Sequence, residues 1–221
     1  MKKEAKPYLE ITPLQLTRAQ KFYVWVKVGI DFAIGLLGVV LFALPMLAIA
    51  IAIKLDSPGP VFFVQPRIGY RGKHFRICKF RTMFITARHD IAGYDYEEAA
   101  SQVTRVGKVL RKTSLDELPN LFNLLTGKMS LVGYRPSQDS EPELNTAREG
   151  FGLYQIRPGI TGWAQINGRD ILAAHPTLKA QFDGYYLRHL SPWLDIKILL
   201  TTFVKVLKAD DVVDGNILEK L

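Results

Sequence analysis

The sequence predicts an α+β protein that is mostly helical, with a small β-hairpin, a kinked re-entrant membrane helix and interfacial amphipathic helices. Three observations lead to this class. Residues 32–53 carry no charged side chain, residues 61–83 hold two strand-like segments around a glycine turn, and most later segments space their apolar residues at helical intervals. The 221 residues suffice for one domain with appendages.

Composition limits the class of protein. The formal net charge of +8 at pH 7 favours anionic partners such as phosphates or a membrane surface. No nucleic-acid-binding module is recognisable, so nucleic acid is not an expected partner. The single cysteine, Cys78, cannot form an internal disulfide, which fits the reducing cytoplasm. Cys78 is expected to be a buried strand residue. Walker A, GxGxxG, HExxH and CxxC motifs are missing, which argues against ATP hydrolysis, dinucleotide binding and structural zinc.

The chain divides into four expected parts. Residues 1–27 are a basic lead in which Phe22, Tyr23 and Trp25 lie beside lysines, as is typical of an anchor at the membrane surface. Residues 28–56 form the membrane helix-hairpin, residues 57–208 the main domain, and residues 209–221 a loose tail.

The apolar segment is long enough to span a membrane, yet two features favour a re-entrant hairpin. A straight helix over residues 32–53 would be roughly 33 Å long, against a bilayer core of about 30 Å. Pro45 lies inside it and would kink it. Both flanks are basic, so the positive-inside rule gives no orientation for a crossing. The alternative is a helix that crosses the membrane once and tolerates its proline.

Residues 61–65 and 73–83 are expected to form a β-hairpin around the turn at residues 69–72. In the second strand, strict alternation puts Lys79 and Arg81 on the same face as Ile77 and Met83. Two cations on an otherwise apolar face indicate a buried anion. The alternative is that their aliphatic stems cover apolar surface while the charges reach water.

Residues 84–103 are expected to be a surface excursion, and residues 105–111 a short basic helix. Next, Ser114 and Glu117 have the spacing of a capping box at the start of a helix, and Asp116 lies in its first turn. An apolar stripe follows at Leu118, Leu121, Phe122 and Leu125. The carboxylate pair is therefore either catalytic or merely a helix start, in which Glu117 caps and Asp116 is favoured by the helix dipole.

The C-terminal half contains a second polar segment. Residues 157–169 hold three glycines together with Arg157, Gln165 and Arg169, a combination suited to binding phosphate oxygens. A tight loop around a buried Trp163 is the alternative. Helices are expected at about residues 140–148, at 176–190 and at 192–208. The last is amphipathic and could lie in the membrane interface or pack into the core.

Several of these segments occur in order in one protein family. They are the kinked segment with Pro45, Gln65-x-Arg67-x-Gly69, KFRTM at 79–83, SLDELPNLFNLL at 114–125, GKMSLVG at 127–133, Arg135-Pro136, and RPGITGWAQINGR at 157–169. In these motifs the chain resembles the monotopic phosphoglycosyltransferases, the bacterial sugar transferases that start glycoconjugate assembly. It departs from the family at Tyr134, where Pro-Arg-Pro is frequent.

The resemblance implies transfer of a sugar phosphate from a UDP-sugar to polyprenyl (undecaprenyl) phosphate, with release of UMP. It implies Asp116 as the nucleophile of a covalent phosphosugar–aspartyl intermediate, and Glu117 beside it as a metal ligand or in handling the acceptor. Mg²⁺ is the expected cofactor, held by Asp116 and Glu117. Residues 57–208 are then a catalytic domain on the cytoplasmic face of the bacterial inner membrane.

The charged residues near these motifs complete the expected site. A nucleophilic carboxylate must be ionised, and a helix start with Arg111 and Lys112 nearby is expected to favour the anion. Donor phosphates need cations and polar groups around them. The candidates for binding the substrate phosphates or nucleotide are Lys79, Arg81, Arg111, Arg135, Arg157, Gln165 and Arg169.

Other functions remain open at this stage. One is a membrane-bound protein that binds lipid phosphates or nucleotide sugars without turnover. Others are a peripheral scaffold whose basic face binds anionic lipid, and a glycosyltransferase that releases UDP. Membrane lipid is an expected partner, homodimer formation is left open, and no residue identifies a particular sugar.

Overall fold

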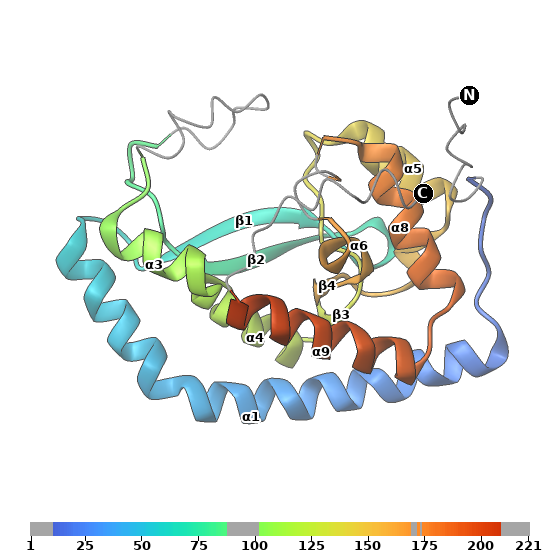
Figure 1. Ribbon diagram of the computed structural model, residues 1–221, viewed down its shortest axis with the longest axis horizontal. Coiled ribbons are helices and arrows are strands. Elements are labelled where there is room, and N and C mark those ends of the chain that lie inside the picture. The colour runs from blue at the N-terminus through green and yellow to red at the C-terminus, as the bar shows by residue number, and fades with distance from the viewer. Residues whose placement is uncertain (1–10, 88–101, 169–171, 173, 209–221) are drawn as a thin grey trace.

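The computed structural model describes residues 11–87, 102–168, 172 and 174–208 (Figure 1). The expected tail at 209–221, most of the excursion at 84–103 and the candidate Arg169 lie outside these residues. The described elements are α1 (Arg18–Asp56), β1 (Phe62–Ile68), the 3₁₀ turn η1 (Tyr70–Gly72), β2 (His74–Phe80), α3 (Arg105–Thr113), η2 (Leu115–Asn120), α4 (Leu121–Leu125), β3 (Ser130–Val132), α5 (Pro142–Gly150), η3 (Leu153–Gln155), β4 (Gly159–Thr161), α6 (Trp163–Ile166), α8 (Pro176–Arg188) and α9 (Pro192–Lys208).

α1 is a single long helix that runs along one side of the protein. It begins within residues 1–27, at a capping box between Thr17 and Gln20, and continues across residue 28 without a break. It contains Pro45, and Figure 1 shows that it bends where the blue ribbon turns cyan, so the predicted kink is confirmed. Proline removes a helix hydrogen bond and clashes with the preceding turn. The helix is long and apolar enough to cross a membrane by length and composition.

The predicted β-hairpin is confirmed. β1 and β2 are antiparallel, with a register that runs from Phe62 opposite Phe80 to Ile68 opposite His74. The connection is the 3₁₀ turn η1, in which Arg71 has a left-handed φ of 59°. Cys78 lies in β2 but is half-buried, so the expectation of a buried cysteine is wrong. Its strand neighbour Ile77 faces inward against α4.

The main core lies between the short strands and the helices that follow them. β3 and β4 form a two-stranded parallel sheet that sequence reasoning did not predict. Its residue Val132 packs with apolar side chains of α5, α8 and α9. Tyr134 is fully buried in this core, with the Arg148 guanidinium 5.0 Å from the centre of its ring. The residue that departs from the family pattern is therefore a core residue here.

The predicted capping box at Ser114 is wrong. Ser114 has a left-handed φ of 55° because it ends α3, where its N–H donates to the carbonyl of Arg111, and its side chain caps nothing. The following residues form the 3₁₀ helix η2, which contains Pro119, before α4 begins. Proline lacks the N–H that a continuous α-helix would need here. Leu124, outside the predicted apolar stripe, is buried, whereas Phe122 is exposed.

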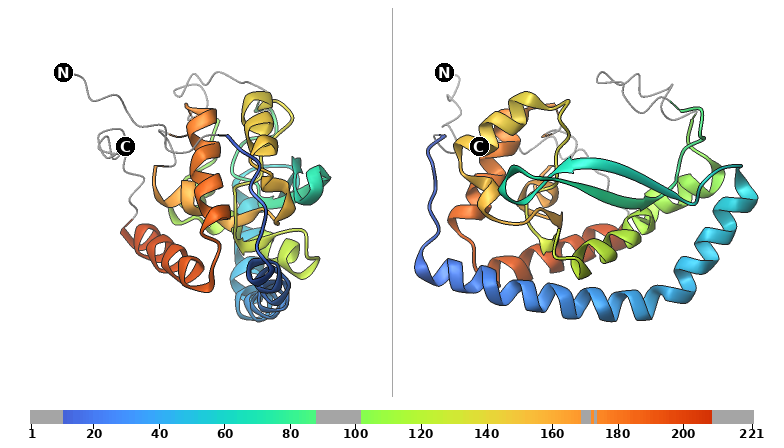
Figure 2. Two further views of the ribbon diagram at one scale, coloured as in Figure 1. Left: turned by 90° about the vertical axis from the view of Figure 1, so that its right-hand side faces the viewer. Right: turned by 180° about the vertical axis from the view of Figure 1, so that it is seen from behind.

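The three C-terminal helices are confirmed as α5, α8 and α9. α9 lies alongside the first part of α1 (Figures 1 and 2). It buries Leu194, Asp195 and Ile198 against the body and exposes a row of large apolar side chains, namely Trp193, Ile196, Leu200, Phe203 and Val204. The expectation that this helix packs into the core is therefore confirmed for one face, while the opposite face is apolar and exposed, and its position in the membrane interface stays a prediction.

One buried ion pair offers a test of the core. Arg148 donates two hydrogen bonds to Asp183 Oδ2, from Nε at 3.0 Å and from Nη2 at 2.5 Å. Both side chains are almost fully buried. We predict that Asp183→Asn lowers the free energy of unfolding by about 3–5 kcal/mol, because it leaves the arginine charge buried and uncompensated. Denaturant unfolding in detergent micelles measures this. The double variant Asp183→Leu/Arg148→Met is the control and should recover most of the loss; a single-variant loss below about 1 kcal/mol would contradict the prediction.

Candidate active site

The carboxylate pair lies on η2, which packs against β2. Glu117 is held from three directions. Its Oε1 accepts hydrogen bonds from Lys79 Nζ of β2 and from Arg135 Nη2, the latter at 3.2 Å. Its Oε2 accepts from Asn120 Nδ2 at 2.6 Å. The structure thus brings four of the predicted site residues together, since Asp116 is adjacent in the chain.

The charges around Glu117 keep it ionised. Burial alone would raise the pKa of this carboxyl, but the charges and hydrogen bonds of Arg135 and Lys79 outweigh it and lower the pKa from 4.5 to about 2. Burial and the nearby Arg135 lower the pKa of Lys79, while Glu117 acts in the opposite direction. Glu117 is therefore a fixed anion that organises two cations at the site.

Asp116 differs from its neighbour. Within the part of the chain that the structure describes, its carboxylate has no hydrogen bond or ion pair. Burial and the charge of Glu117 raise its pKa, and Lys79, Arg135 and Arg111 only partly oppose this. The expectation that a helix start would favour the anion is wrong in direction, because burial beside a second carboxylate dominates. An unpartnered carboxylate next to two cations is suited to attack an electrophile whose own charge those cations neutralise.

Arg111 and Arg81 make different contacts, and only Arg111 acts on Asp116. Arg111 is exposed, and its Nε donates to Thr82 Oγ1 at 2.9 Å, so its charge acts on Asp116 from the rim. Arg81 is buried, and its terminal nitrogens donate to the carbonyls of Pro58 and Ser57 at 2.5 and 2.8 Å. It therefore ties the strand that carries Lys79 to the residues that end α1.

Arg157 and Gln165 are not in contact with the carboxylate pair. Arg157 Nε donates to the carbonyl of Gly127 at 2.6 Å, and its guanidinium lies 5.2 Å from the centre of the Tyr70 ring. Gln165 Nε2 donates to the carbonyl of Ile160 at 3.0 Å. Arg169 lies outside the described residues. Of the candidates for binding phosphate, Lys79, Arg135 and Arg111 surround Asp116.

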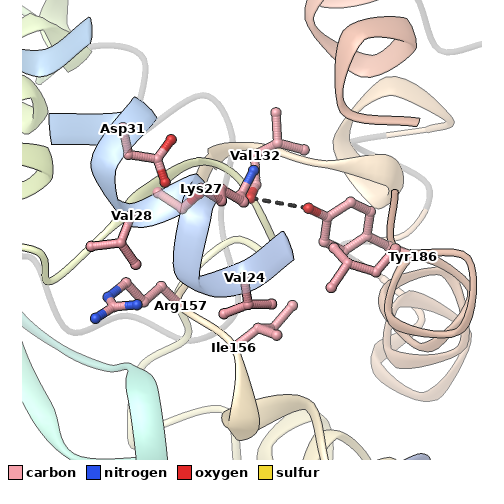
Figure 3. A pocket seen from close by; sticks show the side chains of 10 residues that line it. Val24, Lys27, Val28, Asp31, Val132, Ile156, Arg157 and Tyr186 are labelled. Carbon is pink, nitrogen blue, oxygen red and sulfur yellow. Dashed lines mark hydrogen bonds between the residues drawn. The ribbon is translucent and has the colours of Figure 1, made fainter. Parts of the chain in front are cut away.

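A small pocket lies between the first part of α1, β3 and α8. Lys27, Asp31 and Arg157 line it among apolar side chains (Figure 3). Lys27 forms a buried ion pair with Asp195 of α9, whose Oδ1 also accepts from the Tyr186 hydroxyl at 2.7 Å. Sequence reasoning did not pair these residues. A charged Asp195 among the apolar residues of its helix was the available signal.

The carboxylate pair fits a Mg²⁺ ion. Magnesium in phosphate chemistry is bound through one or two carboxylates and completes its octahedral shell with water and substrate oxygens. In the described part of the chain, Asp116 has no hydrogen bond or ion pair and Glu117 Oε2 has only the Asn120 contact, whereas Oε1 contacts two cations. No group of three or more His, Cys, Asp or Glu that could hold a metal occurs among the described residues. A metal held here would therefore rely on substrate oxygens.

The comparisons with known proteins agree with this arrangement. The sequence profile of the family described as "Bacterial sugar transferase" matches residues 22–209, which include all of α1 except its first four residues and every later element to α9. The match covers most of the chain. The chain therefore belongs to the bacterial sugar transferase family.

Three relatives illustrate the family. The chain is 41% identical over 84% of its length to the UDP-N-acetylgalactosamine-undecaprenyl-phosphate N-acetylgalactosaminephosphotransferase of Aeromonas hydrophila, covering 44% of that protein. It is 42% identical over 79% of its length to the UDP-glucose:undecaprenyl-phosphate glucose-1-phosphate transferase of Escherichia coli, covering 39%. The protein of the same name from Caulobacter vibrioides is 41% identical over 82% of the chain, and the match covers 70% of that protein. The chain thus spans less than half the length of the first two relatives.

The lowered pKa of Glu117 predicts a pH-dependent stability. A carboxyl whose pKa is lowered by folding stabilises the folded protein at pH values above its unfolded pKa, near 4.5. This stabilisation disappears as the pH falls through the folded pKa of about 2. Its full size is about 3 kcal/mol. Comparing Glu117→Gln with the unsubstituted protein, we therefore expect a large difference in unfolding free energy at pH 7 that shrinks towards pH 3. Guanidinium unfolding in micelles with a chelator measures it. The control is Glu143→Gln; a pH-independent difference at Glu117 would contradict the prediction.

Proposed function

We propose that this protein transfers a sugar phosphate from a UDP-sugar to polyprenyl phosphate and releases UMP. Two observations support the proposal. The chain belongs to a family whose named relatives are undecaprenyl-phosphate sugar-phosphate transferases. Among the described residues, its site also leaves one carboxylate, Asp116, without a hydrogen bond or ion pair beside the cations Lys79 and Arg135. The second observation carries the mechanistic part of the proposal.

The first step forms a covalent intermediate. An oxygen of Asp116 attacks the phosphorus nearest the sugar and forms a new P–O bond. The bond from that phosphorus to the oxygen bridging the two phosphates breaks, and UMP leaves with that oxygen and its electron pair. Lys79, Arg135 and Arg111 neutralise the charge that builds on the phosphate oxygens, which is the main contribution a protein makes to phosphoryl transfer.

The second step regenerates the enzyme. An oxygen of polyprenyl phosphate attacks the same phosphorus, the P–O bond to Asp116 breaks, and the carboxylate is released. The product is a polyprenyl diphosphate sugar. Because each step exchanges one anhydride bond at phosphorus for another, neither needs an oxidant or a reductant. Glu117 suits a supporting role, since its own oxygens already hold the two cations in place.

We further propose that Mg²⁺ is the cofactor and that Asp116 and Glu117 would hold it. When bound, the ion supplies charge neutralisation at the diphosphate and helps UMP leave. The raised pKa of Asp116 supports this, since a carboxylate destabilised by burial and by Glu117 gains most from a nearby cation.

The proposal places the reaction at the cytoplasmic surface of the bacterial inner membrane. The acceptor is a lipid, while the donor is a soluble nucleotide sugar. The bent α1 and the exposed apolar side chains of α9 support an α1 that enters and leaves by the same face. The catalytic residues would then lie beside the headgroups.

The test separates UMP from UDP. Purified protein in detergent is given Mg²⁺, undecaprenyl phosphate and a panel of UDP-sugars, and the released nucleotides are separated by chromatography. We predict UMP release with at least one sugar, abolished by chelation. UDP release would instead indicate a glycosyltransferase. A folded protein that binds the donor and releases neither nucleotide would indicate a binding protein.

Asp116→Asn keeps the side-chain shape and removes the nucleophile. We predict that turnover falls by at least about 10³-fold, because an amide oxygen is a poor nucleophile. UMP release in a single turnover without acceptor should disappear as well. Asp139→Asn, on an exposed loop aspartate paired with His74, is the matched control and should retain full activity. An Asp116→Asn enzyme with unchanged turnover would rule out Asp116 as nucleophile.

A further inference from the structure

The face that α1 turns towards the body differs from the rest of the helix. Most of its side chains are exposed and apolar. Apolar residues towards both ends of α1, such as Val24 and Ile53, pack against the body. Between them, the body-facing row contains Lys27, Asp31 and Gly35, which are buried, and Gly38, which is half-buried. These positions are three or four residues apart and therefore lie on one side of the helix. We call this row the docking stripe.

The two glycines of the docking stripe allow α4 to lie directly against the backbone of α1. A Cβ added at Gly35 would lie 2.9 Å from Leu124 Cβ, and one at Gly38 would lie 3.1 Å from Leu121 Cδ1. The distance at Gly35 is shorter than real Cβ contacts, so a side chain there would force α1 and α4 apart, whereas at Gly38 the Leu121 side chain would have to move by a few tenths of an ångström. At Gly29, on the same helix, an added Cβ meets nothing within 4 Å.

The two charged residues of the docking stripe fix the position of α1 along its own axis. Asp31 Oδ1 accepts a hydrogen bond from the backbone N–H of Leu131 at 3.1 Å. Lys27 forms its buried ion pair with Asp195, which the Tyr23 hydroxyl also contacts at 2.6 Å. Apolar contacts tolerate sliding because they are non-directional, whereas these bonds form in only one register.

Both parts of the active site are joined to these contacts by short pieces of chain. α4 follows η2 directly, and η2 carries Asp116 and Glu117. Leu131 lies in β3, shortly before Arg135. A shift of α1 against the body by one residue would move the membrane helix by about 1.5 Å relative to these groups.

We propose that the docking stripe of Lys27, Asp31, Gly35 and Gly38 sets the depth of Asp116 relative to the membrane surface. It would thereby be required for transfer to a membrane-bound phosphate but not for reaction with the soluble donor. This inference rests on the proposed two-step transfer. A soluble donor diffuses to the site at any depth, whereas the bilayer holds the lipid phosphate at headgroup level. A misplacement of about 1 Å can cost roughly 100-fold in rate.

The test compares Gly35→Ala with Gly29→Ala. Both substitutions raise helix propensity by about 1 kcal/mol, so they differ in the contact with α4. Each variant is placed in vesicles of phosphatidylethanolamine and phosphatidylglycerol. Three rates are measured: UMP release without acceptor, turnover with undecaprenyl phosphate in the bilayer, and turnover with a short, water-soluble isoprenyl phosphate.

We expect Gly35→Ala to match Gly29→Ala within about twofold in the first and third assays and to lose roughly 10- to 100-fold in the second. Equal rates in all three assays, or an equal loss in all three, would overturn the proposal, since the latter describes a purely structural role. If the unsubstituted protein releases no UMP without acceptor, the proposed covalent step fails instead.

A second pair of variants covers the case in which Gly35→Ala does not fold. Asp31→Ala removes the acceptor of the Leu131 N–H, whereas Asp31→Asn keeps an oxygen that can accept it. The alanine variant should show the same selective loss with the bilayer acceptor, and the asparagine variant should recover most of it. Identical behaviour of the two variants would overturn the role of Asp31 as a positioning residue.

Discussion

The site depends on the way in which Glu117 is held. A buried carboxylate is stable only when its charge is compensated, and Lys79 and Arg135 provide that compensation from two different parts of the chain. The interaction draws β2, η2 and the loop after β3 together at one point. Asp116 lies beside the same cations and has no hydrogen bond or ion pair with any described residue. Two adjacent acidic residues thus have different environments: the carboxylate of Glu117 is held in place, and that of Asp116 is available for chemistry.

The contacts that hold α1 against the body are made by chain segments that also carry residues of the candidate active site. Arg81 binds the residues that end α1 and lies on the same chain segment as Lys79, while Asp31 binds the backbone of β3 ahead of Arg135. Lys79 and Arg135, the two cations that contact Glu117, are therefore each close in sequence to a residue that hydrogen-bonds with α1 or with the residues that end it. This arrangement suits an enzyme whose soluble and lipid substrates meet at a surface, because the anchor and the reactive groups cannot move independently.

Much of the fold followed from sequence patterns. The uncharged segment, the alternating hairpin and the helical periodicities near the C-terminus predicted α1, β1, β2, α5, α8 and α9. Predictions from short sequence patterns were wrong where contacts with more distant parts of the chain determine the structure. Ser114 has the sequence of an N-cap but ends α3 instead, and Arg81 has the strand position of a phosphate ligand but binds the end of α1. The Lys27–Asp195 pair joins residues far apart in the chain, and no spacing rule reveals it.

The central claim is that Asp116 becomes covalently bonded to the sugar phosphate. The most direct measurement is mass spectrometry of peptides after the protein is mixed with its UDP-sugar and Mg²⁺ without acceptor, and quenched rapidly in acid. The account predicts a phosphosugar adduct on the peptide that contains Asp116, lost when undecaprenyl phosphate is added before the quench. An adduct on Glu117, or UMP release that requires the acceptor and leaves no adduct, would contradict it.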